Sequence, residues 1–393
     1  MELTTSHIQF IKEHATDDLT RLLLSAAKYP GMDIPFLVDQ IAVRRQIREK
    51  LPSWFENGQL VFPAKIAAEQ CSSEQTAYKQ ELIGESWTIC DLTGGLGIDS
   101  YFLSRKAKHL TYIERFPVYC EAAKHNFSVL EANNITIINA DAAQVVDTLP
   151  EVDAFYIDPA RRGESNKRVF ALQDCEPNLP GLLPALLKRS PHVIAKLSPM
   201  ADIQMTLELL PGTTSVHVLS VRNECKELLF VVEREADGRE PLVRCINFGL
   251  DGMQSFSFTL EEERSAVLVP AGQVGTYLYE PNASVLKAGA FKQIAVRTGV
   301  KKLQVNSHLY TADHLVSDFP GRRFRVDEVL SFTGKLCKGL SKTIPQANIT
   351  VRNFPLSVEE LRKRTKITDG GHVYLFATTL VDGEKVLVKC SKA

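Results

Sequence analysis

Four acidic residues recur along the first half of the chain, each at or just after the end of a short apolar run: Asp91, Glu114, Asp141 and Asp158. In an open α/β sheet, ligands bind outside the carboxyl ends of the strands, so we expect all four carboxylates to border one crevice. A carboxylate that ends the second strand can accept hydrogen bonds from both hydroxyls of a ribose. One that follows the third strand can accept from an exocyclic amine, and Asp91 suits an ammonium or hydroxyl group.

A loop with three glycines, Gly94, Gly95 and Gly97, follows Asp91 and leads into a predicted helix. Glycines allow the backbone to approach a ligand closely, and a helix N-terminus favours electron-rich groups. No Gly-Lys-Ser/Thr sequence follows the loop, which argues against a nucleoside triphosphate. Together with the acidic residues, the loop indicates an adenosine-containing ligand that itself carries a positive charge.

Alternating strand-like and helix-like segments fill the intervals between the acidic residues. The predicted strands are 88–92, 109–114, 135–139, 154–158 and 193–197. The predicted helices between them are 99–105, 117–131, 142–149 and 179–189. This alternation predicts an α/β fold with a parallel sheet and right-handed crossovers. Two further runs, 215–221 and 227–233, are joined by the short polar segment 222–226, which permits an antiparallel pair at the end of the sheet.

The regions before and after this alternating part of the chain have other patterns of apolar residues. Residues 1–82 are predicted to be mostly helical, with helices over 17–29, 36–49 and 73–82. Within them, Trp54 and Phe55 are expected to dock against the next domain, with base stacking as the alternative. Beyond the sheet, the sequence predicts a β-like segment, a strand and a helical stretch at 244–269, 277–281 and 284–298. The last module is predicted to contain strands 322–329, 348–351, 373–379 and 384–389 and helices 335–342 and 357–364.

Charge is unevenly distributed along the 393 residues. The chain has a formal net charge of −1, but residues 321–393 contain 14 Lys and Arg against 7 Asp and Glu. A basic terminal module on an acidic body suggests a polyanionic partner. The eight cysteines include no Cys-x-x-Cys pair, so we expect no metal site and reduced thiols in a cytoplasmic protein. No apolar run is long enough to span a membrane, and we see no signal peptide.

The ordered motifs around the four acids resemble those of class I S-adenosylmethionine-dependent methyltransferases over residues 87–233. The resemblance implies that the glycines pass under the methionine part of S-adenosyl-L-methionine, that Glu114 holds the ribose and that Asp141-Ala142 flanks the adenine. The cofactor-binding residues that it implies are Asp91, Thr93, Gly94, Gly95, Gly97, Asp99, Glu114, Arg115, Asp141, Ala142 and Asp158.

Asp158-Pro159-Ala160-Arg161 resembles the Asp-Pro-Pro-aromatic motif of methylases that act on the exocyclic amines of bases, and these four residues are the predicted catalytic residues. Ala160 and Arg161 depart from that motif, although a guanidinium can also stack on a base. The stretch also looks like the Asp-Pro-Pro-Arg of uridine-C5 methylases. Those enzymes need a nucleophilic Cys, for which Cys225 is the candidate, with a small buried thiol as the other interpretation.

The terminal module resembles a THUMP domain, the RNA-capturing unit of several tRNA-modifying enzymes, and a ferredoxin-like piece is expected before it at 277–320. The whole chain, including Glu69-Gln70-Cys71-Ser72-Ser73-Glu74, is similar to bacterial methyltransferases with a THUMP-like C-terminus. The implied domains are 1–82 (helical), 83–235 (Rossmann-like methyltransferase), 236–320 (β-rich connection and ferredoxin-like) and 321–393 (THUMP-like). The predicted RNA-binding residues are Arg161, Arg162, Arg322, Arg323, Arg325, Arg362, Arg364 and Lys366.

These observations predict an RNA methyltransferase that acts on a base nitrogen, an exocyclic amine, in tRNA. Alternatives are a uridine-C5 methyltransferase, a small-molecule or protein methyltransferase, and an RNA-binding protein whose catalytic centre has lapsed. The basic terminal module argues against a small-molecule or protein substrate. The sequence leaves open the RNA species, the modified atom and the oligomeric state.

Overall fold

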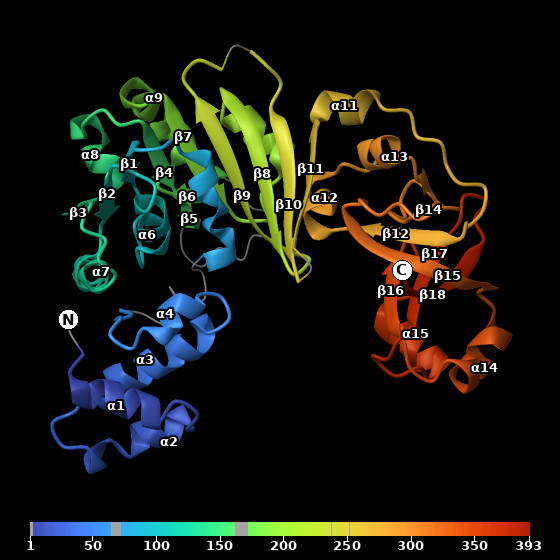
Figure 1. Ribbon diagram of the computed structural model, residues 1–393, viewed down its shortest axis with the longest axis horizontal. Helices are drawn as coiled ribbons and strands as arrows, with labels where there is room; N and C mark the ends of the chain where they lie inside the picture. The colour runs from blue at the N-terminus through green and yellow to red at the C-terminus, as the bar shows by residue number, and fades with distance from the viewer. Residues whose placement is uncertain (1–2, 64–71, 162–171, 237, 251) are drawn as a thin grey trace. The chain divides into compact units, whose positions relative to one another are not determined.

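The computed structural model describes residues 3–63, 72–161, 172–236, 238–250 and 252–393 (Figure 1). It divides into two compact units, of which the first contains residues 1–216 and 227–239 and the second contains 217–226 and 240–393. No helix in the described ranges is long and apolar enough to cross a membrane.

The first unit contains the predicted parallel sheet. Its parallel strands are β1 (Thr88–Asp91), β2 (His109–Glu114), β3 (Ile135–Asn139), β4 (Ala154–Ile157) and β7 (His192–Leu197). They lie in the order β3-β2-β1-β4-β7, so the order reverses beside β1, where ligands bind in such sheets. β9 (Glu224–Glu233) pairs with β7 in the antiparallel direction, which confirms the expected antiparallel end of the sheet.

The full sheet has nine strands, in the order β11-β10-β8-β9-β7-β4-β1-β2-β3, and includes β8 (Thr213–Val221), β10 (Leu242–Gly249) and β11 (Gly252–Thr259). Arg222 and Asn223 both have positive φ between β8 and β9, as a two-residue hairpin turn requires. The connection is therefore shorter than the predicted segment 222–226, and Cys225 and Lys226 belong to a strand.

Helices connect the parallel strands much as predicted. They are α6 (Ile98–Ser104), α7 (Pro117–Val129), α8 (Ala142–Val145), α9 (Leu179–Arg189) and α10 (Ile203–Leu209). The predicted helix 142–149 is split because a 3-10 turn, η3 (Val146–Thr148), follows α8. The sequence analysis missed α10, a short helix capped by Asp202, whose side chain accepts from the Met205 amide.

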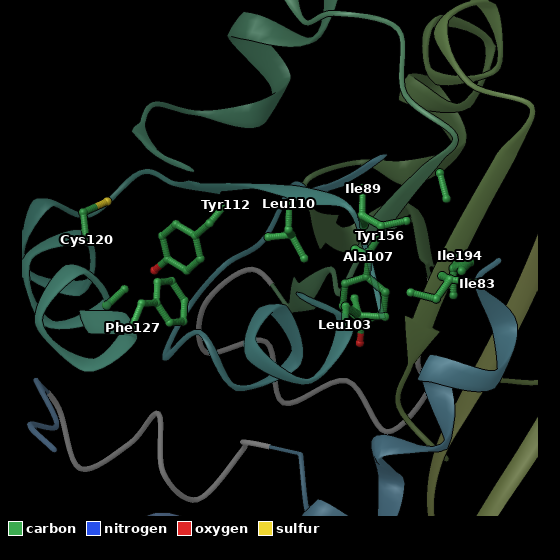
Figure 2. Close-up of a cluster of buried hydrophobic side chains, with 12 residues drawn as sticks. Ile83, Ile89, Leu103, Ala107, Leu110, Tyr112, Cys120, Phe127, Tyr156 and Ile194 are labelled. Carbon is green, nitrogen blue, oxygen red and sulfur yellow. The ribbon is translucent and has the colours of Figure 1, made fainter. Parts of the chain in front are cut away.

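The core beside the glycine loop runs along one face of the sheet (Figure 2). Tyr112 from β2 meets Phe127 from α7 edge-on, with ring centroids 5.7 Å apart. Ile89, Leu110 and Ile194 continue this core along the strands, and all are buried. Together, these side chains hold the carboxyl ends of β1 and β2 in a fixed relation.

The N-terminal segment is built from α1 (Thr5–Glu13), α2 (Leu19–Leu24), α3 (Ile34–Ile47) and α4 (Pro52–Glu56), with 3-10 turns η1 (Ala26–Lys28) and η2 (Glu74–Leu82). The predicted helix 17–29 therefore breaks at Ser25, and 73–82 is 3-10 rather than α-helical. Trp54 is fully buried and packs with Tyr101 of α6, with ring centroids 5.9 Å apart. This confirms docking rather than base stacking for Trp54.

The second unit contains a seven-stranded sheet in the order β13-β14-β12-β15-β18-β17-β16. Its strands are β12 (Tyr277–Pro281), β13 (Lys301–Lys302), β14 (Tyr310–Ala312), β15 (Gly321–Ser331), β16 (Asn348–Arg352), β17 (Tyr374–Thr379) and β18 (Lys385–Lys392). The helices between these strands are α12 (Ala283–Ala288), α13 (Gln293–Thr298), α14 (Gly334–Thr343) and α15 (Val358–Thr365). A break at Gly289 splits the predicted helical stretch 284–298.

The predicted β segment 244–269 ends early, at Thr259. Here the Thr259 side chain accepts from the Glu262 amide and Glu262 accepts from the Thr259 amide, which is a capping box that starts α11 (Leu260–Ser265). The alternating pattern concealed this helix start because Thr259 also suits a strand.

Candidate active site

The glycine loop between β1 and α6 is shaped by positive φ angles and by a tight approach to the core. Gly95 and Gly97 have φ values of +52° and +78°, which side chains rarely adopt. A Cβ on Gly94 would lie 2.2 Å from the Tyr112 ring. The Tyr112 hydroxyl donates to the Gly95 carbonyl over 2.6 Å. The same side chain therefore both packs against Gly94 and holds Gly95 by a hydrogen bond.

A cavity of about 570 Å³ opens beside this loop, at the carboxyl ends of the parallel strands, and its size suits a nucleoside-containing ligand. Its lining includes Thr93, Gly94, Gly95, Asp99, Glu114, Arg115, Asp141, Ala142, Asp158 and Ala160. Nine of these ten residues were predicted to bind cofactor; one of the nine, Asp158, was also predicted to be catalytic, as was the tenth residue, Ala160. The structure therefore brings most of the predicted site together in one cavity.

Glu114 lies on the cavity wall with both carboxylate oxygens already oriented by backbone amides. Oε2 accepts from the Gly95 amide and Oε1 from the Phe116 amide, each over 2.9 Å. Each oxygen retains a lone pair for a further donor. Asp141 is held similarly as the cap of α8, where its Oδ1 accepts from the Ala143 amide over 2.9 Å.

Asp91 departs from the prediction that all four acids border the crevice, because it does not line the cavity. Its side chain is fully buried, and its oxygens accept from the Thr93 amide and the Ser100 hydroxyl. Burial raises the pKa of Asp91 to about 7, although those two hydrogen bonds oppose the rise. Asp91 is the last residue of β1. Its side chain fixes the glycine loop by joining the Thr93 amide at the start of the loop to Ser100 in α6.

A cluster of charged residues lies beside Asp158, at the part of the cavity that Asp99 and Lys196 also line. Asp99 of α6 receives hydrogen bonds from Lys79 of η2, from Lys196 of β7 over 3.0 Å and from the Ser72 hydroxyl over 3.0 Å. Tyr156 also donates to Asp99 over 2.8 Å. Burial alone would raise the pKa of Asp99, but the ammonium groups of Lys196 and Lys79 hold it well below its usual range.

Lys196 also joins Asp158 to this cluster, with its Nζ 2.6 Å from Asp158 Oδ2. The pKa of Asp158 is nevertheless raised, because the partial burial of its side chain, which is 37% exposed, and the charge of Asp99 outweigh the attraction of Lys196. The pKa of Lys196 lies well above its usual value because Asp158 and Asp99 together overcome the effect of burial.

Sequence reasoning missed Ser72, Lys79 and Lys196. Lys196 left a signal, since it is the one charged residue among the otherwise apolar positions of 193–197. Lys79 left none, and Ser72 stood out only as part of the stretch 69–74 that resembles the methyltransferase family. Both belong to the N-terminal segment and reach the site only through tertiary packing.

The remaining predicted catalytic residues continue from β4. Ala160 and Arg161 form the short strand β5, which pairs with β6 (Cys175–Glu176). Ala160 is exposed at the cavity, whereas the Arg161 side chain and all of Arg162 lie outside the described residues. Cys225 is half-buried and does not line the cavity.

The predicted RNA-binding residues of the terminal module fall into two groups. Arg322 pairs with the buried carboxylate of Glu280, Arg323 donates to the Ser317 carbonyl, and Arg362 pairs with Asp369 and donates to the Ala347 carbonyl. These three guanidiniums therefore serve internal contacts, which the sequence pattern did not reveal. Arg325, Arg364 and Lys366 are exposed.

The comparisons with known proteins agree with this geometry. The chain has 39% sequence identity to a crystal structure of a putative methyltransferase from Porphyromonas gingivalis W83, with a TM-score of 0.89, over 99% of this chain and 98% of that one. The chain belongs to this methyltransferase family. Residues 277–320 match a family model described as a ferredoxin-like domain, and 321–392 match one described as THUMP domain-like. The chain is thus a class I S-adenosylmethionine-dependent methyltransferase with the C-terminal modules that the sequence predicted.

Curated relatives match shorter parts of this methyltransferase. It is 37% identical over 79 residues to ribosomal RNA small subunit methyltransferase J from Colwellia psychrerythraea, covering 18% of this chain and 29% of that protein. It is 24% identical over 170 residues to an uncharacterized RNA methyltransferase from Staphylococcus aureus strain MSSA476, covering 39% and 37%. The chain thus spans about a third of the length of these relatives.

The contact between Gly94 and Tyr112 is testable through stability. We expect Gly94→Ala to lower the free energy of unfolding by about 1–3 kcal/mol, because the new methyl group overpacks a buried ring. Urea unfolding followed by circular dichroism measures the change. Gly272→Ala is the control, since a Cβ there meets open space. Equal stability of the two variants would contradict the tight approach.

Proposed function

We propose that this methyltransferase methylates RNA, at an exocyclic amine of a base in a cytoplasmic tRNA. The observation that carries the proposal is the position of Asp158, whose carboxylate lines the same cavity as the glycine loop and Glu114. A THUMP-like module with exposed basic residues on the same chain supports RNA as the substrate. The relatives described as RNA methyltransferases support the same substrate class.

The cavity fits the cofactor by its size and by its oxygen acceptors. We propose that Glu114 accepts from the ribose hydroxyls with its remaining lone pairs, and that Asp141 and Ala142 border the adenine. Thr93, Gly94 and Gly95 line the cavity on the side proposed for the methionine part, whereas Gly97 is not among the lining residues. Asp91 supports this loop through its bonds to Thr93 and Ser100 rather than contacting the ligand, because its side chain is fully buried and does not line the cavity.

Bound S-adenosylmethionine supplies a methyl group that is already activated by the sulfonium, so the protein's task is alignment. In the proposed site, Asp158 accepts a hydrogen bond from the acceptor amine and thereby orients the nitrogen. The Asp158 amide is held by the Thr93 hydroxyl over 2.7 Å, which ties the acceptor side to the glycine loop. Pro159, Ala160 and Arg161 follow at the point where a flipped-out base would enter.

The uridine-C5 alternative is less well supported, because it needs a cysteine at the acceptor. Among the residues recorded along the cavity there is no cysteine, and Cys225 lies elsewhere on β9. A small-molecule or protein acceptor would give the basic terminal module no role.

The cofactor assignment predicts a loss of affinity in Glu114→Ala. Removing charged hydrogen bonds to the ribose is expected to weaken S-adenosylmethionine binding by about 1.5–3 kcal/mol in isothermal titration calorimetry. Glu121→Ala is the matched control, because Glu121 is an exposed glutamate on α7. Unchanged affinity in Glu114→Ala would refute its role.

The substrate assignment predicts transfer of labelled methyl groups to RNA from a strain that lacks the gene. The wild type is expected to label the tRNA fraction at one nucleoside, identified by mass spectrometry as an N-methylated base. Asp158→Asn is expected to lower the rate about 100-fold while the RNA still binds, because the acceptor loses its alignment. A methyl group at pyrimidine C5, or a label in protein only, would refute the proposal.

The terminal module predicts a salt-dependent contribution to RNA binding. Arg364→Gln with Lys366→Gln is expected to flatten the plot of log affinity against log salt by about one for each lost phosphate contact. Affinity for S-adenosylmethionine is expected to stay the same. The control is Lys12→Gln with Lys28→Gln, two exposed lysines of the N-terminal segment. Equal slopes in both double variants would mean that Arg364 and Lys366 do not contact the RNA.

A further inference from the structure

Lys196 lines the cavity next to Asp158, and all three N–H groups of its ammonium have a hydrogen-bond partner. Its Nζ is 2.6 Å from Asp158 Oδ2, 3.0 Å from Asp99 Oδ2 and 2.9 Å from Ser72 Oγ, and its side chain is only 10% exposed. An ammonium has three N–H donors, and these three acceptors account for them. Lys196 is therefore placed to act on Asp158 rather than to donate to a methyl acceptor.

The sheet itself sets this contact. β4 and β7 are parallel neighbours whose last residue pair is Ile157 with Ala195, so Asp158 and Lys196 each directly follow the last pair between these two strands. Two side chains at equivalent positions on neighbouring strands have little freedom to separate, because buried strands hold them. The Asp158–Lys196 pair is consequently a fixed part of the cavity wall.

Of the groups that act electrostatically on Asp158, two are lysines and the rest are carboxyl or phenol groups. They come from six elements or their flanks and comprise Lys196, Lys79, Asp99, Asp91, Tyr156 and Glu227. Burial and Asp99 favour the protonated form of Asp158, whereas Lys196 is the strongest group that favours the ionised form. A protonated carboxyl would donate an O–H, whereas a carboxylate only accepts.

We propose that Lys196 is a positioning residue that keeps Asp158 ionised and holds its Oδ2, so that Oδ1 accepts an N–H from the methyl acceptor. This inference deepens the proposed function, on which it rests, because it names the acceptor chemistry: a nitrogen that still carries hydrogen. A ring nitrogen without hydrogen would face a carboxylate with nothing to donate. Within the described ranges no hydrogen bond to Oδ1 is recorded.

Lys79 provides a matched comparison within the same cluster. It is fully buried and, like Lys196, it donates to Asp99 and to Ser72. Among the described residues it forms no hydrogen bond or ion pair with Asp158, on which it acts only as a weaker, more distant charge than Lys196. A general loss of buried ion pairs should therefore appear equally in Lys79→Met and Lys196→Met. A loss of the positioning of Asp158 should appear mainly in Lys196→Met.

The test measures the titration of Asp158 directly, by 13C NMR of protein labelled at aspartate Cγ. The Asp158 signal is assigned by its disappearance in Asp158→Asn. Lys196→Met is expected to move the titration midpoint of Asp158 to higher pH, because the main favourable charge is lost, whereas Lys79→Met moves it much less. Lys196→Arg keeps the charge and is expected to restore a midpoint near that of the wild type. Calorimetry with S-adenosylmethionine checks that each variant is folded.

Methyl transfer to the tRNA fraction gives the second readout. The acidic limb of kcat is expected to follow the Asp158 midpoint to higher pH in Lys196→Met, with kcat about 100-fold lower at pH 6 and KM for the cofactor nearly unchanged. Equal midpoints in wild type and Lys196→Met, or equal shifts in the two Met variants, would overturn the role of Lys196. A shifted midpoint in an enzyme that labels no RNA would uphold that role but refute the proposed function.

Discussion

The site depends on the pairing of buried charges around Asp99. Removing an ion from water costs several kcal/mol, and only complete pairing in good geometry offsets that cost. Asp99 meets this condition with two ammonium groups and two hydroxyls, contributed by the N-terminal segment, β4 and β7. The pairing joins elements that are distant in the sequence, and it fixes the part of the cavity wall that Asp99 and Lys196 form.

This constraint explains why the N-terminal segment is more than a separate helical module. Ser72 and Lys79 reach the ion cluster, and Glu74 accepts from the Ser53 amide over 2.8 Å, which links η2 to α4. Trp54 then anchors α4 against α6, the helix that carries Asp99. If the segment were displaced, Asp99 and Lys196 would lose partners at once. Breaking a buried pair in this way typically costs about 3–5 kcal/mol.

The second unit also contains a buried carboxylate that pairs with two cationic side chains, at Glu280. This carboxylate has a side chain only 3% exposed and pairs with both Arg322 and Arg352. Because β12 lies next to β15 in the sheet, with Glu280 opposite Arg322, the pair ties the ferredoxin-like piece to the first strand of the THUMP-like module. Basic residues of the terminal module therefore divide into those that pair within the unit, such as Arg322 and Arg362, and those that are exposed, such as Arg325 and Arg364.

The order of strands and helices in the parallel sheet followed from sequence because local patterns dictate it. β2, β3 and α9 have the predicted bounds, since apolar runs and capping residues act over a few positions. The glycine loop and the acids at strand ends predicted the cavity for the same reason, because parallel strands bring their carboxyl ends to one edge.

Which charged side chains pair with one another was decided only by the tertiary structure. Asp91 and Glu114 have the same pattern in the sequence, yet Asp91 is buried under the loop while Glu114 faces the cavity. The folded structure shows which residues pair with Lys79, Lys196 and Glu280. It also shows that Arg322 and Arg362 form ion pairs within the protein. Local sequence specifies which way a strand runs and where it ends. Which charge neutralises which depends on distances between segments far apart in the chain, and these exist only in the folded protein.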